Sequence, residues 1–374
     1  MNRFVDLVTK GARAMDIYSP RVQARELGPE SQMIRLDSNE NPLGPSPRAL
    51  EAMQRALADA HLYPDNECDA LATRLSGLHQ VPVEQILVTA GSTGMLSLLC
   101  HTLLGPGLNA ITSQKSFIVY GMAVRATGAE LIETPIHNDD FDLSAILNAI
   151  NDRTRLVLLA NPNNPTAKLL DAGELERFIH LIPSHVVVVI DEAYYEFAAR
   201  FAESRHVEYS RSLADLRRGA SVVVLRTFSK AHGLAGLRIG YGLGPADLMS
   251  YCRLMQDTYS VSSVAQAAAL AALDDGDHVA RSVAHNIEQA QVLENGLSVL
   301  GFRVPLTWAN FVYCELKDNA GEFARRLRKE GISVRPLGAW GAPSCIRVSI
   351  GTAEQNDAFL KAIRKVGHLS GTTR

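Results

Sequence analysis

Short apolar runs alternate with amphipathic segments between about residues 68 and 250. The run at 186–190, Val-Val-Val-Val-Ile, is continuous, which indicates a strand buried on both faces of a sheet. Alternating strands and helices predict a parallel sheet covered by helices, which is an α/β fold. We predict strands at 85–89, 110–113, 129–133, 155–160, 185–191 and 221–227, and helices at 47–60, 67–79, 93–104, 117–127, 142–151 and 171–182.

The pattern changes after about residue 255. A long helical region at 262–300 is followed by short strands at 302–304, 311–316, 332–335 and 345–349, with a helix at 320–330 among them. This mixture predicts a small α+β domain. The first residues indicate an arm that packs with it. The predicted division is therefore an arm at 1–37, a large domain at 38–255 and a small domain at 256–374.

Composition excludes several classes of partner. The chain has 47% hydrophobic residues and a net charge of −3, from 37 basic and 40 acidic residues. We therefore expect neither nucleic acid nor an anionic membrane as a partner. No apolar run has the length of a membrane span, and Asp6 stands where a signal peptide would have its apolar core, so we expect a cytoplasmic protein. The spacing of cysteine and histidine predicts no metal site.

One segment that follows a predicted strand carries unusual chemistry. Thr227, Ser229 and Lys230 come at the end of the apolar run 221–225, and Arg238 lies eight residues beyond the lysine. A lysine just past a buried strand is costly unless it is neutralised, paired or covalently used. The hydroxyls and the arginine indicate an anion at the same place. Taken alone, a surface lysine in an ordinary α/β domain explains this segment equally well.

Three other strands end in residues that could belong to the same site, because ligands of open α/β sheets bind beyond the carboxyl ends of the strands. One strand runs through a glycine turn into Ser92 and Thr93, whose hydroxyls and backbone amides could cradle an anion. Another runs into an Asn/Pro loop at 161–166. A third ends in Asp191, which is expensive to bury unless a cation meets it. Each has a plainer explanation as a turn or a helix cap, but together they favour one site.

These motifs resemble those of fold-type I enzymes that use pyridoxal 5'-phosphate (PLP), most closely the histidinol-phosphate aminotransferase branch of the class I/II aminotransferases. The likeness extends from about Leu36 to Gly351. It implies a large domain with a mostly parallel seven-stranded sheet between helices, and a smaller C-terminal α+β domain. It also implies that Lys230 carries PLP as a Schiff base and that Asp191 keeps the ring nitrogen protonated, which makes the ring an electron sink.

The resemblance assigns roles to further residues of this chain. Asn164 and Tyr194 would bond the ring hydroxyl, Phe117 would stack on the ring, and Tyr63 would reach the cofactor phosphate of a partner subunit, which implies a homodimer with shared active sites. The other implied contacts are Ser92, Thr93, Thr227, Ser229 and Arg238 to the cofactor, with the phosphate among their targets, and Arg347, Arg335, Tyr18 and Asn39 to the substrate.

Some residues differ from the family pattern. An acid is more usual at the position of Thr93, glycine at that of Ala167, and an aromatic or apolar residue at that of His232; Lys115 is a further departure. Because alanine tolerates positive φ poorly, we expect the loop at Ala167 to be slightly reshaped. His232 is left without a role.

The implied activity is ping-pong transamination between an anion-bearing amino donor, of the histidinol phosphate or aromatic amino acid type, and a 2-oxo acid. Three alternatives stay open. The same scaffold could support a PLP-dependent decarboxylase of the threonine-phosphate type, or a PLP-binding regulator, although no DNA-binding module is evident. A nucleotide-dependent oxidoreductase is disfavoured because no Gly-x-Gly-x-x-Gly follows a strand.

Overall fold

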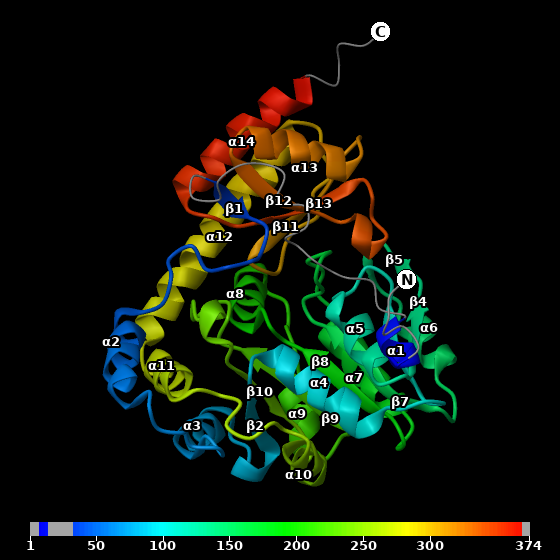
Figure 1. Cartoon of the computed structure of the whole chain (residues 1–374). Coiled ribbons are helices and arrows are strands. Elements are labelled where there is room, and N and C mark those ends of the chain that lie inside the picture. Colours follow the sequence, from blue (N-terminus) through cyan, green and yellow to red (C-terminus); the bar gives the residue numbers. More distant parts are fainter. Residues whose placement is uncertain (1–6, 14–32, 369–374) are drawn as a thin grey trace.

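A seven-stranded sheet forms the centre of the larger part of the molecule (Figure 1). The computed structural model describes residues 7–13 and 33–368. The strand order is β2-β10-β9-β8-β7-β3-β4, and only the pairs made by β10 are antiparallel in this sheet. The expected mostly parallel, seven-stranded sheet is confirmed. Its strands are β2 (Ile86–Thr89), β3 (Asn109–Ser113), β4 (Glu130–Thr134), β7 (Thr154–Ala160), β8 (Val187–Asp191), β9 (Val222–Thr227) and β10 (Gly240–Leu243).

Helices cover both faces of this sheet, because its strands have apolar residues on both sides. On one face, Leu87, Val189 and Val223 pack against α4 (Ser92–Leu103), α5 (Val119–Ala126) and α10 (Ala246–Leu254). On the other face, the alternate residues Val88 and Ile190 belong to a core with α3 (Asp69–His79), α6 (Leu143–Ala149), α7 (Ala172–Leu181) and α9 (Ser212–Arg217).

A second sheet of four strands, in the order β1-β12-β13-β11, forms the smaller part. Its strands are β1 (Ile34–Leu36), β11 (Phe311–Glu315), β12 (Ile332–Pro336) and β13 (Cys345–Ser349), and its helices are α12 (Gly276–Val299), α13 (Ala320–Lys329) and α14 (Ala353–His368). Leu293, Phe323 and Phe359 join sheet and helices in one core. Because β1 pairs with β12, residues 34–36 belong to this sheet although they come far earlier in the chain.

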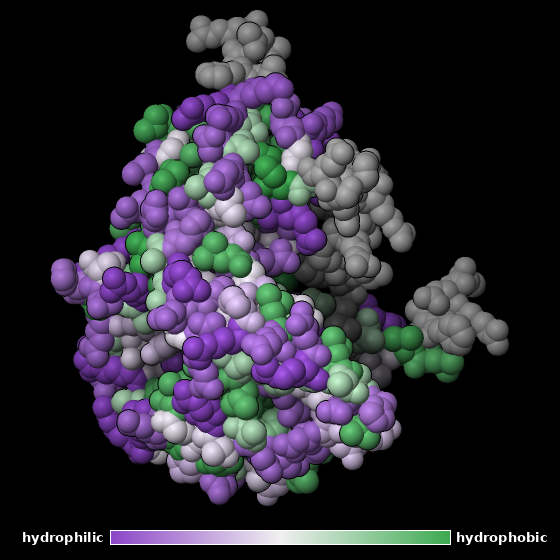
Figure 2. Space-filling view, turned by 90° about the vertical axis from the view of Figure 1, so that its left-hand side faces the viewer, coloured by the Kyte–Doolittle hydropathy of each residue, from purple (hydrophilic) through white to green (hydrophobic). Residues whose placement is uncertain are grey.

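The remaining described elements are short or connect the two sheets. They are α1 (Lys10–Arg13), α2 (Pro47–Ala56), η2 (Leu57–Asp59), η3 (Val83–Gln85), the hairpin of β5 (Ile136–His137) and β6 (Asp140–Phe141), α8 (Tyr195–Arg205), η4 (Ala235–Leu237), α11 (Ser263–Leu273) and η5 (Gly338–Trp340). Figure 2 shows one face of the molecule, where hydrophilic residues predominate and hydrophobic ones are scattered. Within the described ranges, no helix is long and apolar enough to cross a membrane.

The structure differs from the sequence prediction at several elements. The helical region at 262–300 is two helices, because Asp274 ends α11 and the Asp275 side chain caps the start of α12. The segment 302–304 contributes a single bridge, Arg303 to Glu315, instead of a strand. Strands β1 and β10 were not predicted. Helix α11 contacts α2 and α3, beside the large sheet, and the division at residue 255 stays a prediction.

Candidate active site

A cavity of about 360 Å³ opens at the carboxyl ends of β7, β8 and β9, where both sheets contribute residues. Most of the side chains that the sequence analysis selected line it: Asn39, Ser92, Thr93, Phe117, Asn164, Asp191, Tyr194, Thr227, Ser229, Lys230, Arg238 and Arg347. Their segments are far apart in the chain, so the fold alone brings them together.

Lys230 follows the end of β9, and its side chain reaches toward the loop after β1. Its Nζ donates to the carbonyl oxygens of Ser38, at 3.3 Å, and Asn39, at 3.0 Å. Burial, followed by the positive charge of Arg347, lowers the pKa of Lys230 to about 7. An amine with this pKa is largely neutral slightly above neutral pH, and a neutral amine is both a nucleophile and a base.

Asp191 ends β8 and is buried. Its carboxylate accepts hydrogen bonds from the Tyr120 hydroxyl and the Ala193 amide, both at 3.2 Å. Burial raises the pKa of Asp191 to about 6 against these hydrogen bonds. Across the described residues, none forms an ion pair with it. A buried carboxylate that faces a cavity and has no ion-pair partner suits a positively charged ligand group.

The Tyr194 hydroxyl can still donate one hydrogen bond. The oxygen accepts from Asn39 Nδ2 at 3.0 Å and from Asn164 Nδ2 at 3.2 Å. A hydroxyl has two acceptor positions and one donor, so its own proton remains for an acceptor in the cavity. Asn164 is itself held by Arg347, whose Nη1 donates to Asn164 Oδ1 at 2.7 Å.

An anion cradle lies at the start of α4, which begins at Ser92. Gly91 has a φ of +78°, and a Cβ there would come within 2.6 Å of Arg238 Nη2. A Cβ on Gly240 would lie 2.5 Å from the Ser92 amide nitrogen. Arg238 Nη1 also donates to Ser229 Oγ at 3.3 Å. Gly91 thus lets the Arg238 guanidinium approach the N-terminus of the helix, and Gly240 lets strand β10 lie against it. Backbone amides and the helix dipole favour a phosphate there.

These features together fit pyridoxal phosphate. The cradle at Ser92 and Arg238 suits its phosphate, Asp191 its protonated ring nitrogen and the Tyr194 hydroxyl its ring oxygen, while Lys230 supplies the amine. Phe117 lines the cavity as well. No three His, Cys, Asp or Glu side chains in the described ranges are grouped in a way that could hold a metal ion.

The sequence analysis missed Tyr120, which does not line the cavity itself but contacts Phe117 and Asp191, which do. Tyr120 packs edge-on against Phe117, with ring centroids 5.5 Å apart, and donates to Asp191. Its position one helical turn after Phe117 was the signal that could have identified it. Ser38, Glu40 and Trp340 line the cavity. Ser38 and Glu40 flank Asn39, which the sequence analysis did select, whereas nothing in the local sequence distinguishes Trp340.

Three of the predicted contacts are not found in this cavity. Tyr63 is 82% exposed and stacks on Tyr259, with centroids 4.6 Å apart. Arg335 lies opposite Arg347 in the pairing of β12 with β13, but its Nε donates to the Asp37 carbonyl oxygen and it does not line the cavity. Tyr18 lies outside the described residues.

The structure shows where three of the residues that depart from the family pattern, Ala167, Lys115 and His232, are placed. Ala167 adopts a φ of +60°, and its methyl group is buried in the core of the smaller part. The loop thus keeps positive φ despite the alanine. Lys115 also has positive φ, at +49°, and its Nζ lies 3.5 Å from Asp139. His232 is buried outside the cavity lining, with its Nε2 3.6 Å from Glu196.

The amino-acid sequence is similar to that of known aminotransferases over nearly its whole length. Residues 31–363 match the family described as aminotransferase class I and II. Histidinol-phosphate aminotransferase 2 of Pseudomonas aeruginosa is 40% identical over 371 residues, covering 98% of this chain and 99% of the relative. Histidinol-phosphate aminotransferase 1 of Thiobacillus denitrificans is 42% identical over 344 residues, covering 92% and 88%.

A solved structure is similar over nearly the whole length. It is histidinol-phosphate aminotransferase of Sinorhizobium meliloti in complex with pyridoxal-5'-phosphate, with a TM-score of 0.89 at 26% identity and coverage of 99% of both chains. Aspartate aminotransferase of Thermus thermophilus with maleate, at 22% identity and a TM-score of 0.81, shares the fold.

Proposed function

This chain belongs to the class I and II aminotransferases and uses pyridoxal phosphate, and we propose that it takes histidinol phosphate as amino donor and a 2-oxo acid as acceptor. The observation that carries the choice of donor is the 40% identity to a histidinol-phosphate aminotransferase over 98% of the chain. The relatives reported above are aminotransferases, and none is a decarboxylase. This donor would give the enzyme a role in amino-acid biosynthesis.

Two arginines support a substrate that carries its own anion. Arg238 comes from the turn after β9, and Arg347 comes from β13 in the smaller part, and both line the cavity. Arg238 lies at the cradle for the cofactor phosphate, which leaves Arg347 for the anionic group of the donor. Arg335 lies on β12, opposite Arg347 on β13. It would be a second contact for the phosphate of the amino donor if that phosphate extends beyond the cavity lining.

The residues of the chain have distinct tasks in the reaction. When bound, pyridoxal phosphate supplies an aldehyde that takes up the amino group and a ring that withdraws electrons from the carbon bearing it. Lys230 Nζ would take the proton from that carbon, since its lowered pKa leaves a large share of the amine neutral at and slightly above pH 7. Asp191 holds a proton on the ring nitrogen, and the Tyr194 hydroxyl donates to the ring oxygen.

A donor screen tests this proposal. Histidinol phosphate, phenylalanine and tyrosine are each mixed with 2-oxoglutarate, and glutamate formation is measured. We expect the highest kcat/KM with histidinol phosphate. We expect Arg347→Met to raise the KM for that donor about 10²-fold, the usual loss when one partner of a buried charge pair is removed. Cofactor binding should change little.

The matched control is Arg153→Met, because Arg153 is an exposed arginine with its side chain 61% accessible. It should leave all donors unaffected. Glutamate formation from aromatic amino acids alone would contradict the proposed donor, and release of CO2 without glutamate would indicate a decarboxylase.

We also place a homodimer interface around Tyr63, as part of the same proposal. Exposed apolar residues gather on two segments that the Tyr63–Tyr259 stack and the Arg253–Glu67 ion pair join. Exposed apolar residues gathered in this way are typical of an interface. Its exposed members are Leu57, Leu62, Tyr63, Tyr251, Leu254, Met255 and Tyr259. A partner subunit on this surface would receive the Tyr63 hydroxyl at its own cofactor phosphate.

Mixed dimers test the shared site. Tyr63→Ala and Lys230→Ala proteins are unfolded together, refolded together and assayed. A mixed dimer would combine an intact Lys230 with an intact Tyr63 from the other subunit in one of its two sites, so the mixture should exceed the summed activity of the separate variants. No gain in a mixture that sediments as dimers would contradict the role of Tyr63.

We propose a cytoplasmic location as well. All five cysteines are buried, and no disulfide forms among them. Buried thiols of this kind are usual in a reducing compartment.

A further inference from the structure

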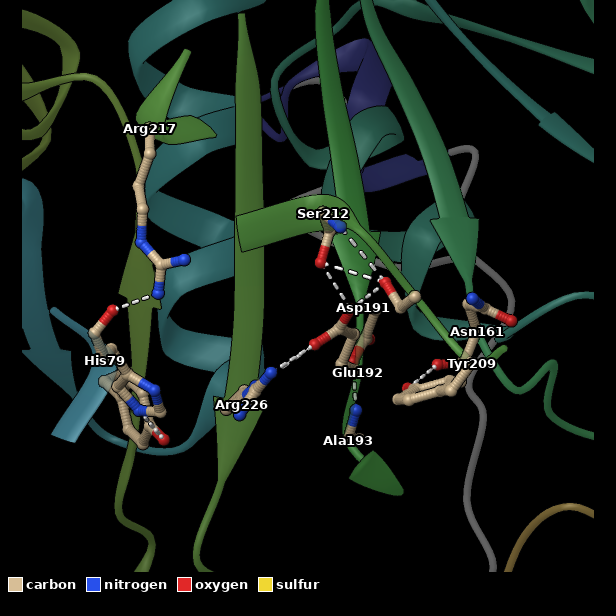
Figure 3. Close-up of polar contacts among 11 residues, drawn as sticks. His79, Asn161, Asp191, Glu192, Ala193, Tyr209, Ser212, Arg217 and Arg226 are labelled. Carbon is tan, nitrogen blue, oxygen red and sulfur yellow. Dashed lines mark hydrogen bonds and ion pairs between the residues drawn. The ribbon is translucent and has the colours of Figure 1, made fainter. Parts of the chain in front are cut away.

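The strand ends that carry the active site also carry a buried ion pair on the opposite face of the sheet. Glu192 directly follows Asp191, and Arg226 directly precedes Thr227. Successive residues of a strand face opposite sides, and the ladder continues to Glu192, whose amide donates to the Leu225 carbonyl oxygen at 2.9 Å. Figure 3 shows the ion pair between Glu192 and Arg226 beside Asp191. Neither member of the pair lines the cavity.

The Glu192 carboxylate is fully engaged. Arg226 donates to Glu192 Oε2 through Nε at 3.1 Å and Nη2 at 2.7 Å. The hydroxyls of Ser210 and Ser212 donate to Oε1 at 2.7 Å and 2.5 Å. The Arg226 guanidinium also lies over the Tyr195 ring, 3.3 Å from its centroid. The side chains of the ion pair are 6% and 0% exposed, so water does not screen it.

A buried ion pair of this kind contributes little to net stability. The cost of removing two charges from water offsets most of their attraction, and apolar replacements of similar volume are often neutral or stabilising. What the pair does supply is geometry, because a guanidinium that donates two charge-assisted hydrogen bonds to one carboxylate oxygen fixes distance and direction. Here it joins the end of β8 to the end of β9, and these ends present Asp191 and Lys230 to the cavity.

We propose that Glu192 and Arg226 are positioning residues for transamination. Their ion pair fixes the ends of β8 and β9 relative to each other from the face opposite the cavity, and so fixes where Asp191 and Lys230 meet the cofactor. The inference rests on the aminotransferase activity and not on the identity of the amino donor, so any donor that the wild-type protein accepts can be used to test it.

The charges of the pair also act on Asp191. Burial raises the pKa of Asp191, and the neighbouring Glu192 carboxylate adds to the rise. Arg226 offsets the Glu192 charge at close range. Removal of both charges takes away the contribution of Glu192 and should therefore lower the pKa of Asp191.

The double variant Glu192→Gln/Arg226→Met is the main test, because it removes both charges and leaves no buried ion unpaired. In the cofactor-loaded protein we expect kcat to fall about 10²-fold, as when catalytic groups are displaced by about 1 Å, with KM changed less than about twofold. We also expect a shifted pH midpoint in the visible absorbance of the bound cofactor. The melting temperature should change little.

Two further variants complete the test. Gln289→Met is the control, because it breaks an equally buried hydrogen bond, from Asn356 Nδ2 to Gln289 Oε1 at 3.0 Å. Neither residue lines the cavity, so this variant should lower only the melting temperature. Arg226→Lys keeps the charge but not the pair of hydrogen bonds from one planar group, and should give an intermediate kcat. It also provides the test if the double variant does not fold. Wild-type kcat and an unshifted midpoint in the double variant, or in Arg226→Lys if that alone folds, would overturn the proposal.

Discussion

Lys230→Ala is expected to abolish transamination, with a fall in kcat of about 10⁴-fold or more, the upper end of what loss of an acid–base group removes. No other lysine lines the cavity in the part of the chain that the structure describes. The variant should also lose the visible absorbance that arises when the amine binds pyridoxal phosphate. The fold should survive, because Nζ contacts two backbone carbonyl oxygens and no carboxylate.

Absorbance and glutamate formation are measured after loading with pyridoxal phosphate. Lys168→Ala is the control, because Lys168 lies in a different hollow of the surface and its loss should change neither quantity. A Lys230→Ala protein that keeps the absorbance of the wild type would refute the central assignment.

The pH dependence of cofactor uptake gives a second measure of Lys230. Burial and Arg347 lower its pKa from 10.5 to about 7 in the protein without cofactor. Only the neutral amine reacts, so covalent uptake should accelerate as the pH rises through about 7 and then level off. With an ordinary lysine the rate would continue to rise toward pH ~10. Stopped-flow absorbance at a series of pH values distinguishes the two courses.

Most of the residues selected from the sequence line one cavity, because their meeting follows from topology. Parallel strands have their carboxyl ends at one edge, so polar residues after several buried strands must converge. Asp191 and Lys230 could therefore be paired without a structure. The hydrogen bond from Tyr120 to Asp191 could not be predicted, because it joins residues 71 positions apart. The spacing of Tyr120 from Phe117 places those two rings together but does not show that Asp191 is the partner of the hydroxyl.

Other features depend on contacts that no local pattern records. Strand β10 was missed because Gly240 and Gly242 dilute its apolar run. The structure requires both glycines, since a Cβ would come within 2.5 Å of the Ser92 amide nitrogen at one position and 2.7 Å of the Met95 side chain at the other. No local pattern points to the role of Arg226, because its partner, Glu192, lies at the end of the neighbouring strand.

Asp191→Ala is expected to separate cofactor binding from turnover. The phosphate cradle and Tyr194 do not depend on the carboxylate, so pyridoxal phosphate should remain bound. Without the carboxylate the ring nitrogen loses its proton and the ring withdraws electrons poorly. We expect kcat to fall by about 10³-fold or more, the range associated with lost electrostatic stabilisation. Binding is measured by absorbance titration and turnover by glutamate formation.

Although Asp191→Ala should lose activity, it should not lose stability when the cofactor is absent. The pKa of Asp191 is raised to about 6 in the folded protein without cofactor, from a model-peptide value of about 3.9. A raised carboxyl pKa favours folding at acid pH, and this contribution is lost as the pH rises through about 6. At neutral pH the buried charge therefore costs stability, and Asp191→Ala without cofactor should melt no lower than the wild type. Asp191→Asn retains an acceptor for Tyr120 without the charge. If it turned over at a near-normal rate, the charge would not be what the reaction requires.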